Sequence, residues 1–134
     1  MGAVSHIGIA VENLEEAIEL FSEILGCRPE SIEDIAEQKV KVAIFRPGGE
    51  NTTAIELVCP QSESSPVKKY LDKQGPGLHH ISIGVEDLAG KLKKLKSNDF
   101  RLIDEAPRDG AEGKKIAFVH PSSTAGVLIE LEQE

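Results

Sequence analysis

SHIGIAVENL at residues 5–14 and HHISIGVEDL at residues 79–88 are two versions of one segment, separated by a shift of 74 positions. The same shift relates AIELV at residues 54–58 to LIELE at residues 128–132. Self-similarity at a fixed offset indicates a duplicated structural unit. The sequence therefore predicts one fold that is built from two related modules.

The composition of the 134-residue chain is typical of a globular protein. Apolar residues make up 40% of it and charged residues 28%, without a long apolar run or a signal-like N-terminus. We therefore expect one cytoplasmic domain over residues 1–134, with no membrane partner. The net charge of −8 argues against a nucleic-acid partner. Cys27 and Cys59 are expected to be buried thiols, because nothing marks the chain as secreted.

The first module, residues 4–60, is predicted to form a strand, a helix and three further strands. Alternation in the opening strand places His6 and two small residues on one face and branched aliphatic residues on the other. Asn13 is the expected N-cap of the helix, and Gly26 its expected end. The further strands are expected around residues 30–35, 40–45 and 53–59.

The second module, residues 78–133, is predicted to repeat this order. Residues 61–77 link the modules, and Ser65 followed by Pro66 predicts a short helix in the linker. Asp87 is the expected N-cap of the second-module helix. The later strands are expected around residues 101–105, 115–120 and 126–131.

One imidazole and one carboxylate recur in each module at the shared offset. Each of the two glutamates lies between aliphatic residues in a strand, so alternation places it on the opposite face from them. Because the aliphatic faces are expected to pack against helices, the polar set belongs to the non-helical faces. The four residues of this set are His6, Glu56, His80 and Glu130.

Two imidazoles and two carboxylates suit a borderline divalent metal ion. We therefore predict an α+β fold of two tandem βαβββ modules, whose curved sheets surround a central metal cavity. The types of ligand leave zinc, cobalt, nickel, manganese, iron and magnesium open. The alternative is that the four polar residues are exposed on solvated sheets.

Two further histidines are expected to have structural roles. His79 directly precedes His80 in its strand, so its side chain points to the opposite face. His120 ends a strand just before Pro121. Neither is therefore expected to be a metal ligand.

The chain resembles the vicinal oxygen chelate superfamily, which comprises glyoxalases, bleomycin resistance proteins and dioxygenases. Within it, the chain is most similar to the methylmalonyl-CoA epimerase family. The more specific segments are GLHHI at residues 77–81, FVHP at residues 118–121 and GVLIELEQ at residues 126–133. This resemblance extends over nearly the whole chain and implies a glyoxalase-like fold. The metal ligands that it implies are His6, Glu56, His80 and Glu130.

The resemblance implies epimerisation of (R)- and (S)-methylmalonyl-CoA by proton transfer at C2, through a metal-stabilised enolate. It favours cobalt as the metal and a CoA thioester as the partner, and it implies a homodimer. Glu130 and Glu56 are the expected proton-transfer residues. The substrate-contacting residues are not identified. Lys114, Lys115 and Arg108 are read as exposed loop charges, with contacts to CoA phosphates as the alternative.

One position departs from the family pattern. Val42 stands where family members carry a separate catalytic glutamate, and its side chain cannot accept a proton. Some members carry glutamine at the position of Glu56. Because Glu56 is the symmetry mate of Glu130, we expect Glu56 to serve as both ligand and second base.

Three other functions fit the same superfamily. A glyoxalase I-type lactoylglutathione lyase shares the ligand order, but the long linker over residues 61–78 counts against it. A metal-free ligand-binding or resistance protein would not need the four polar residues. An extradiol dioxygenase needs only three ligands, so Glu56 counts against that function.

Overall fold

The computed structural model describes residues 2–134, which contain three α-helices and eight β-strands. The chain falls into two compact units. We call His6–His79 the amino-terminal unit, and His80–Glu134 with the residues up to Ser5 the carboxy-terminal unit. Within residues 2–134, no helix is long and apolar enough to cross a membrane.

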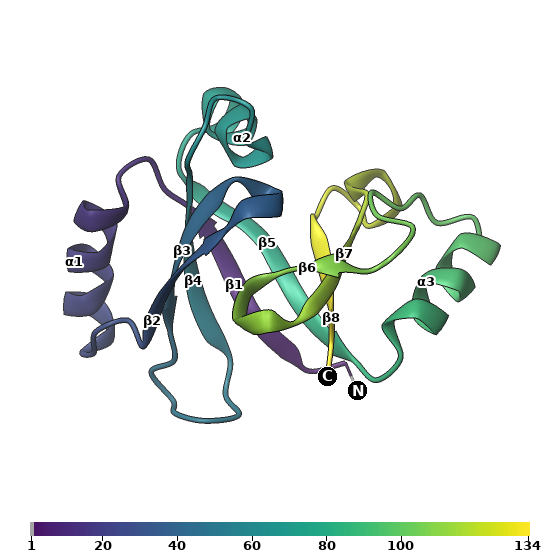
Figure 1. The fold of residues 1–134 in the computed structure, drawn as a ribbon, viewed down its shortest axis with the longest axis horizontal. Helices are drawn as coiled ribbons and strands as arrows, with labels where there is room; N and C mark the ends of the chain where they lie inside the picture. The colour runs from purple at the N-terminus through teal and green to yellow at the C-terminus, as the bar shows by residue number, and fades with distance from the viewer. Residues whose placement is uncertain (1) are drawn as a thin grey trace. The chain divides into compact units, whose positions relative to one another are not determined.

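The amino-terminal unit has a sheet in the order β2-β3-β4-β1. β1 runs parallel to β4, whereas the β2–β3 and β3–β4 pairs are antiparallel. α1 lies along one face of this sheet (Figure 1). The elements are β1 (Val4–Ala10), α1 (Leu14–Leu25), β2 (Ser31–Ile35), β3 (Val40–Phe45), β4 (Ala54–Pro60) and α2 (Pro66–Gln74).

Capping and packing explain where α1 forms. Asn13 Oδ1 accepts a hydrogen bond of 3.0 Å from the backbone N–H of Glu16, and Gly26 ends the helix in the left-handed region at φ 71°. Both caps confirm the sequence prediction. The apolar side of α1 packs on the sheet and forms the core of this unit. The buried core residues are Val11, Ala17, Ile18, Ala43, Phe45 and Leu57.

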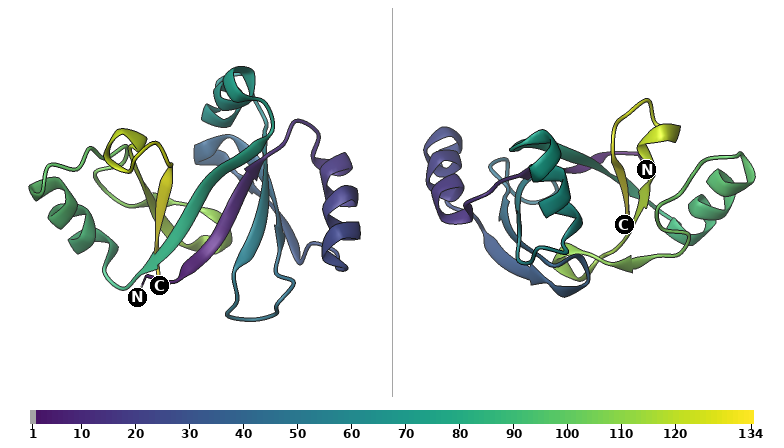
Figure 2. Two further views of the ribbon diagram at one scale, coloured as in Figure 1. Left: turned by 180° about the vertical axis from the view of Figure 1, so that it is seen from behind. Right: turned by 90° about the horizontal axis from the view of Figure 1, so that it is seen from above.

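The carboxy-terminal unit repeats this arrangement, with the strand order β5-β8-β7-β6 (Figure 2). β5 runs parallel to β8, and the β7–β8 and β6–β7 pairs are antiparallel. The elements are β5 (Gly77–Val85), α3 (Leu88–Ser97), β6 (Arg108–Asp109), β7 (Lys115–Val119) and β8 (Ile129–Gln133). Its core, beneath α3, consists of Leu88, Leu92, Ala117, Val119 and Leu131.

Each sheet therefore has a helix-packed face and an opposite face, which we call the inner face. In the amino-terminal unit, Leu57 belongs to the core while its neighbour Glu56 points to the inner face. In the carboxy-terminal unit, Leu131 likewise belongs to the core, and its neighbour Glu130 points to the inner face. This division confirms the predicted faces of the strands.

Two strand predictions were wrong. The segment 101–105 forms an isolated bridge at Leu102 instead of a strand, and β6 pairs further along the chain. There the Asp104 carboxylate accepts a 2.9 Å hydrogen bond from the Phe118 N–H, which a continuous ladder would use. β8 begins at Ile129 rather than at residue 126, because Ala125 and Gly126 have positive φ angles of 56° and 92°.

The linker helix forms as predicted, whereas the two cysteines are less buried than predicted. Ser65 Oγ accepts from the backbone N–H of Val67, and α2 begins at Pro66 as predicted. Cys27 and Cys59 are free thiols, and both are half-buried rather than fully buried. Each packs at the edge of the amino-terminal core, where part of the side chain reaches the surface.

Candidate metal centre

In the amino-terminal unit, β1 and β4 bring one imidazole beside one carboxylate. Gly8 is the register partner of Glu56, so His6 and Glu56 project from adjacent strands on the inner face. His6 Nδ1 lies 3.2 Å from Glu56 Oε2. The side chains of His6 and Glu56 are buried, with 4% and 6% of their surface exposed. The alternative that these polar residues are solvent-exposed is therefore wrong.

In the carboxy-terminal unit, β5 and β8 form the equivalent pair. His80 Nε2 lies 3.8 Å from Glu130 Oε1, and both side chains are again buried. Phe118, the register partner of Glu130 on β7, places its ring edge-to-face with the His80 ring at a centroid distance of 5.7 Å. This contact restricts the rotation of the imidazole beside the carboxylate.

The two pairs fit the ligand chemistry of a divalent metal ion. Metal–nitrogen and metal–oxygen bonds of about 2.1 Å at angles of about 90–110° place two ligand atoms roughly 3.0–3.5 Å apart. The 3.2 Å separation in the His6–Glu56 pair lies within this range, and the 3.8 Å separation of His80 from Glu130 lies just above it. His80 and Glu130 of the carboxy-terminal unit are both buried, and both are residue types that bind metal ions.

The burial of these carboxylates supports the same conclusion. An ionised carboxylate that is removed from water is costly unless a cation or several hydrogen-bond donors stabilise it. Glu56 and Glu130 are each buried next to one imidazole, which is cationic only when it is protonated. A divalent cation would stabilise the carboxylates while both imidazoles stay neutral.

The other two histidines have structural contacts, as predicted. The His79 ring lies edge-to-face with the Tyr70 ring at 4.8 Å. His120 Nδ1 accepts a 3.0 Å hydrogen bond from the backbone N–H of Ser122, which caps the short helix after β7. Each histidine thus holds a turn or a helix in place within its own unit.

The three basic residues near β6 and β7 lie close to carboxylates of their own unit. Arg108 Nη1 is 3.3 Å from Asp104 Oδ1, and Lys115 forms an ion pair with Asp109. These contacts give both residues a structural role, but the prediction of exposed loop charges was wrong for them, because Arg108 begins β6 and is half-buried and Lys115 begins β7. Lys114 differs, because its Nζ lies 3.6 Å from the buried Glu132.

Glu132 is a third buried carboxylate, and the sequence did not identify it as a site residue. It follows Glu130 by two residues in β8, so both side chains lie on the inner face. Ser5 Oγ donates a 2.7 Å hydrogen bond to Glu132 Oε1, the same oxygen that Lys114 approaches. The ELE segment at residues 130–132 was the available signal, because it places two glutamates at the spacing of one strand face.

Glu33 was also missed. Val42 is buried on the same face as Glu56, and its register partner on β2 is Glu33. The half-buried Glu33 is therefore the carboxylate directly beside Val42, the position at which the family resemblance implies a catalytic glutamate. Glu33 lies beside Val42 because of the register between β2 and β3, which the turn at residues 36–39 sets. The sequence alone did not determine this register.

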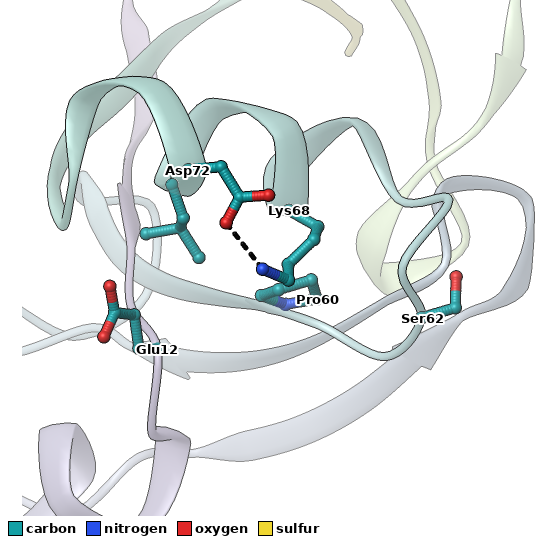
Figure 3. Close-up of a pocket in the computed structure, with 6 residues that line it drawn as sticks. Glu12, Pro60, Ser62, Lys68 and Asp72 are labelled. Atoms are coloured by element: carbon teal, nitrogen blue, oxygen red, sulfur yellow. Dashed lines mark hydrogen bonds and ion pairs between the residues drawn. The ribbon is translucent and has the colours of Figure 1, made fainter.

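A pocket of about 380 Å³ lies in the amino-terminal unit between α2 and the ends of β1 and β4 (Figure 3). Lys68 Nζ forms an ion pair of 2.5 Å with Asp72, and this hydrogen bond raises the pKa of Lys68 above 10.5. Because the lysine already has a carboxylate partner, the lining does not favour an anionic ligand. The lining residues are Glu12, Pro60, Ser62, Lys68, Leu71 and Asp72, and none is a predicted metal ligand.

Cys59 is not suited to be a nucleophile. Burial raises the pKa of the Cys59 thiol above its usual value of 9.0, although a backbone hydrogen bond and Lys41 oppose the shift. The Cys59 thiol donates a hydrogen bond to the backbone carbonyl oxygen of Glu12, with an Sγ–O distance of 3.6 Å. The thiol therefore stays protonated at neutral pH, where a thiolate would be required for attack.

Several known proteins are similar to this chain over most of its length. Residues 5–118 match the family model of the Glyoxalase/Bleomycin resistance protein/Dioxygenase superfamily. The mitochondrial methylmalonyl-CoA epimerase of Dictyostelium discoideum is 36% identical, over 100% of this chain and 80% of its own. The ethylmalonyl-CoA/methylmalonyl-CoA epimerase of Cereibacter sphaeroides is 35% identical, over 99% of this chain and 98% of its own.

A solved structure of a methylmalonyl-CoA epimerase is also closely similar. It was determined in complex with methylmalonyl-CoA and NH4+. It superimposes with a TM-score of 0.91 at 32% identity, and the match covers 100% of this chain and 95% of that one. The glyoxalase-like fold predicted from the sequence is thereby confirmed.

Proposed function

The chain belongs to the glyoxalase/bleomycin resistance protein/dioxygenase superfamily, and we propose that it is a methylmalonyl-CoA epimerase. It interconverts the (R)- and (S)-forms of methylmalonyl-CoA by proton transfer at C2. The observation that carries this function is the buried His–Glu pair repeated on the inner face of each unit. Full-length similarity to named epimerases supports it.

His6, Glu56, His80 and Glu130 together are proposed to bind one divalent metal ion. When bound, the ion supplies a Lewis acid that stabilises the negative charge of the enolate on the thioester oxygen. Cobalt is our first candidate, with zinc, manganese, nickel and magnesium as alternatives. The two imidazoles remain neutral as ligands, so the ionisable carboxylates are the groups available for proton transfer.

Epimerisation requires that one group removes the C2 proton from one face and another delivers a proton to the opposite face. Glu130 and Glu56 are proposed to fill these two roles, because they are the equivalent carboxylates of two similar units. Val42 cannot contribute a proton. If Glu56 acts only as a ligand, Glu33 is the next carboxylate on the same inner face to test.

The chemistry points to a CoA thioester as substrate and needs no redox cofactor or nucleotide. We further propose that the protein is a homodimer. Leu20 and Ile24 on the outer side of α1 are 59% and 75% exposed, which leaves apolar surface for a second copy to cover.

A substrate comparison tests the function. The metal-loaded protein should epimerise methylmalonyl-CoA and leave the hemithioacetal of methylglyoxal and glutathione unchanged. Turnover of the hemithioacetal alone would instead assign a lactoylglutathione lyase. Metal analysis of the purified protein separates both enzymes from a metal-free binding protein of the same fold.

A further inference from the structure

Ser82 has the most buried polar side chain on the inner face of the carboxy-terminal unit. Its exposed fraction is 0%, and its Oγ has no hydrogen-bond partner among the described residues. It lies on β5 two residues after His80, and its register partner on β8 is Glu130. A hydroxyl group is thus placed on the same face as the His80–Glu130 pair and next to it.

A buried hydroxyl without a partner is unfavourable. The cost is about 1–3 kcal/mol in protein interiors, so such groups normally find an acceptor, a donor or an ordered water. The neighbouring position on this face, Gly84, has no side chain, and the Glu134 side chain fills the space that a Cβ at Gly84 would occupy. On the other side of Ser82 along this face of β5 lies His80, and across the register on β8 lies Glu130, so Ser82 is flanked by two candidate metal ligands.

We infer that Ser82 donates a hydrogen bond to an oxygen of the bound acyl group, which makes it a substrate-contacting residue. This inference rests on the proposed function. The acyl group of methylmalonyl-CoA carries a carboxylate, which at neutral pH is an acceptor only, and a serine hydroxyl is a matching donor.

The test compares Ser82→Ala with the wild type and with Ser22→Ala. Ser22 is the matched control, because its Oγ is also buried without a partner among the described residues, but it lies on α1. Malonyl-CoA is the probe for binding, because it carries the carboxylate but has no stereocentre at C2. Each metal-loaded variant is titrated with malonyl-CoA by calorimetry and then assayed for turnover of methylmalonyl-CoA.

Loss of a hydrogen bond to a charged group should weaken malonyl-CoA binding about 10- to 100-fold in Ser82→Ala and lower kcat/KM by a similar factor. Ser22→Ala should stay within about twofold of the wild type. Ser82→Cys has a similar shape, a somewhat larger volume and a weaker donor. It replaces the alanine variant if that variant folds poorly.

The outcomes separate this inference from the proposed function. Unchanged malonyl-CoA affinity in metal-loaded Ser82→Ala would overturn the contact, even if epimerisation is normal. Loss of metal in this variant would also overturn it, because Ser82 would then act through the ligands. If the wild type binds malonyl-CoA without epimerising methylmalonyl-CoA, only the function fails. If it binds neither compound, both fail.

Discussion

Two histidines and two glutamates carry most of the proposed chemistry, and each histidine lies beside one glutamate of its own unit. His6 and His80 are buried, but they alternate with the aliphatic residues that pack under α1 and α3. Their side chains therefore contribute to the inner faces and not to the helix-packed cores. Removing an imidazole should affect metal binding much more than folding.

His6→Ala and His80→Ala are expected to lose the bound metal and the epimerase activity while the fold is retained. Loss of one of four ligands removes a bond to the ion, and none of the helix-packing residues changes. Elemental analysis after dialysis measures the metal, and circular dichroism measures the fold. His79→Ala is the control, because His79 contacts Tyr70 instead. Full metal occupancy in either ligand variant would show that the ligand assignment is wrong.

Glu56→Gln and Glu130→Gln test the proton-transfer roles. Glutamine keeps an oxygen ligand and a similar shape but removes the basic carboxylate. We expect only modestly weaker metal binding, with epimerisation lower by roughly 10²–10⁴-fold, as for loss of a general base. One variant should still exchange the C2 proton of the (R)-substrate for deuterium, and the other that of the (S)-substrate.

Near-normal epimerisation by Glu56→Gln in both directions would reduce Glu56 to a ligand. Glu33→Gln is then the informative variant, since Glu33 is the register partner of Val42. The same exchange assay applies to it. A loss of exchange with only one stereoisomer would identify Glu33 as the second base.

The strands and helices were largely predictable, because their signals are local. Asn13 and Gly26 delimit α1 through hydrogen bonding and backbone conformation, and both are readable from the sequence. The segment 101–105 was not predictable, since the Asp104 side chain there replaces a ladder hydrogen bond. In the candidate site, the two His–Glu pairs were predictable, because the duplication repeats the same residue types at the same offset. Glu132 and Ser82 depend on burial and register, which only the structure supplies.

α1 offers a matched pair of isoleucines that tests the packing of the amino-terminal unit. Ile18 is buried in the core, whereas Ile24 on the same helix is exposed. Ile18→Ala should lower the free energy of unfolding by about 2–5 kcal/mol, because it removes buried methyl groups and leaves a cavity. Ile24→Ala should change it by less than about 0.5 kcal/mol. Equal effects in denaturant titrations would contradict the orientation of α1.

The whole chain has the form of a duplication, in which each unit supplies one sheet, one covering helix and one buried His–Glu pair. A single unit offers two ligands, and borderline divalent ions commonly take four or more. In the proposed function, two copies of the pair supply the four ligands of the metal ion. The duplication also explains why the two proposed bases are equivalent carboxylates.

The protein is expected to sediment as a homodimer at micromolar concentration. Exposed apolar side chains on α1 and open sheet edges are surfaces that a second copy would cover. Analytical ultracentrifugation measures the mass directly. A sedimentation coefficient of a monomer at that concentration would contradict the dimer without affecting the proposed reaction.

Exchange of the C2 proton is the most direct test of metal-assisted epimerisation. In D2O, the metal-loaded protein should incorporate deuterium at C2 of methylmalonyl-CoA and interconvert its two forms. Treatment with a chelator should stop both processes, and added divalent metal should restore them. Mass spectrometry of the thioester measures the incorporation. No exchange by the metal-loaded protein, or undiminished exchange after verified removal of the metal, would contradict the proposed reaction.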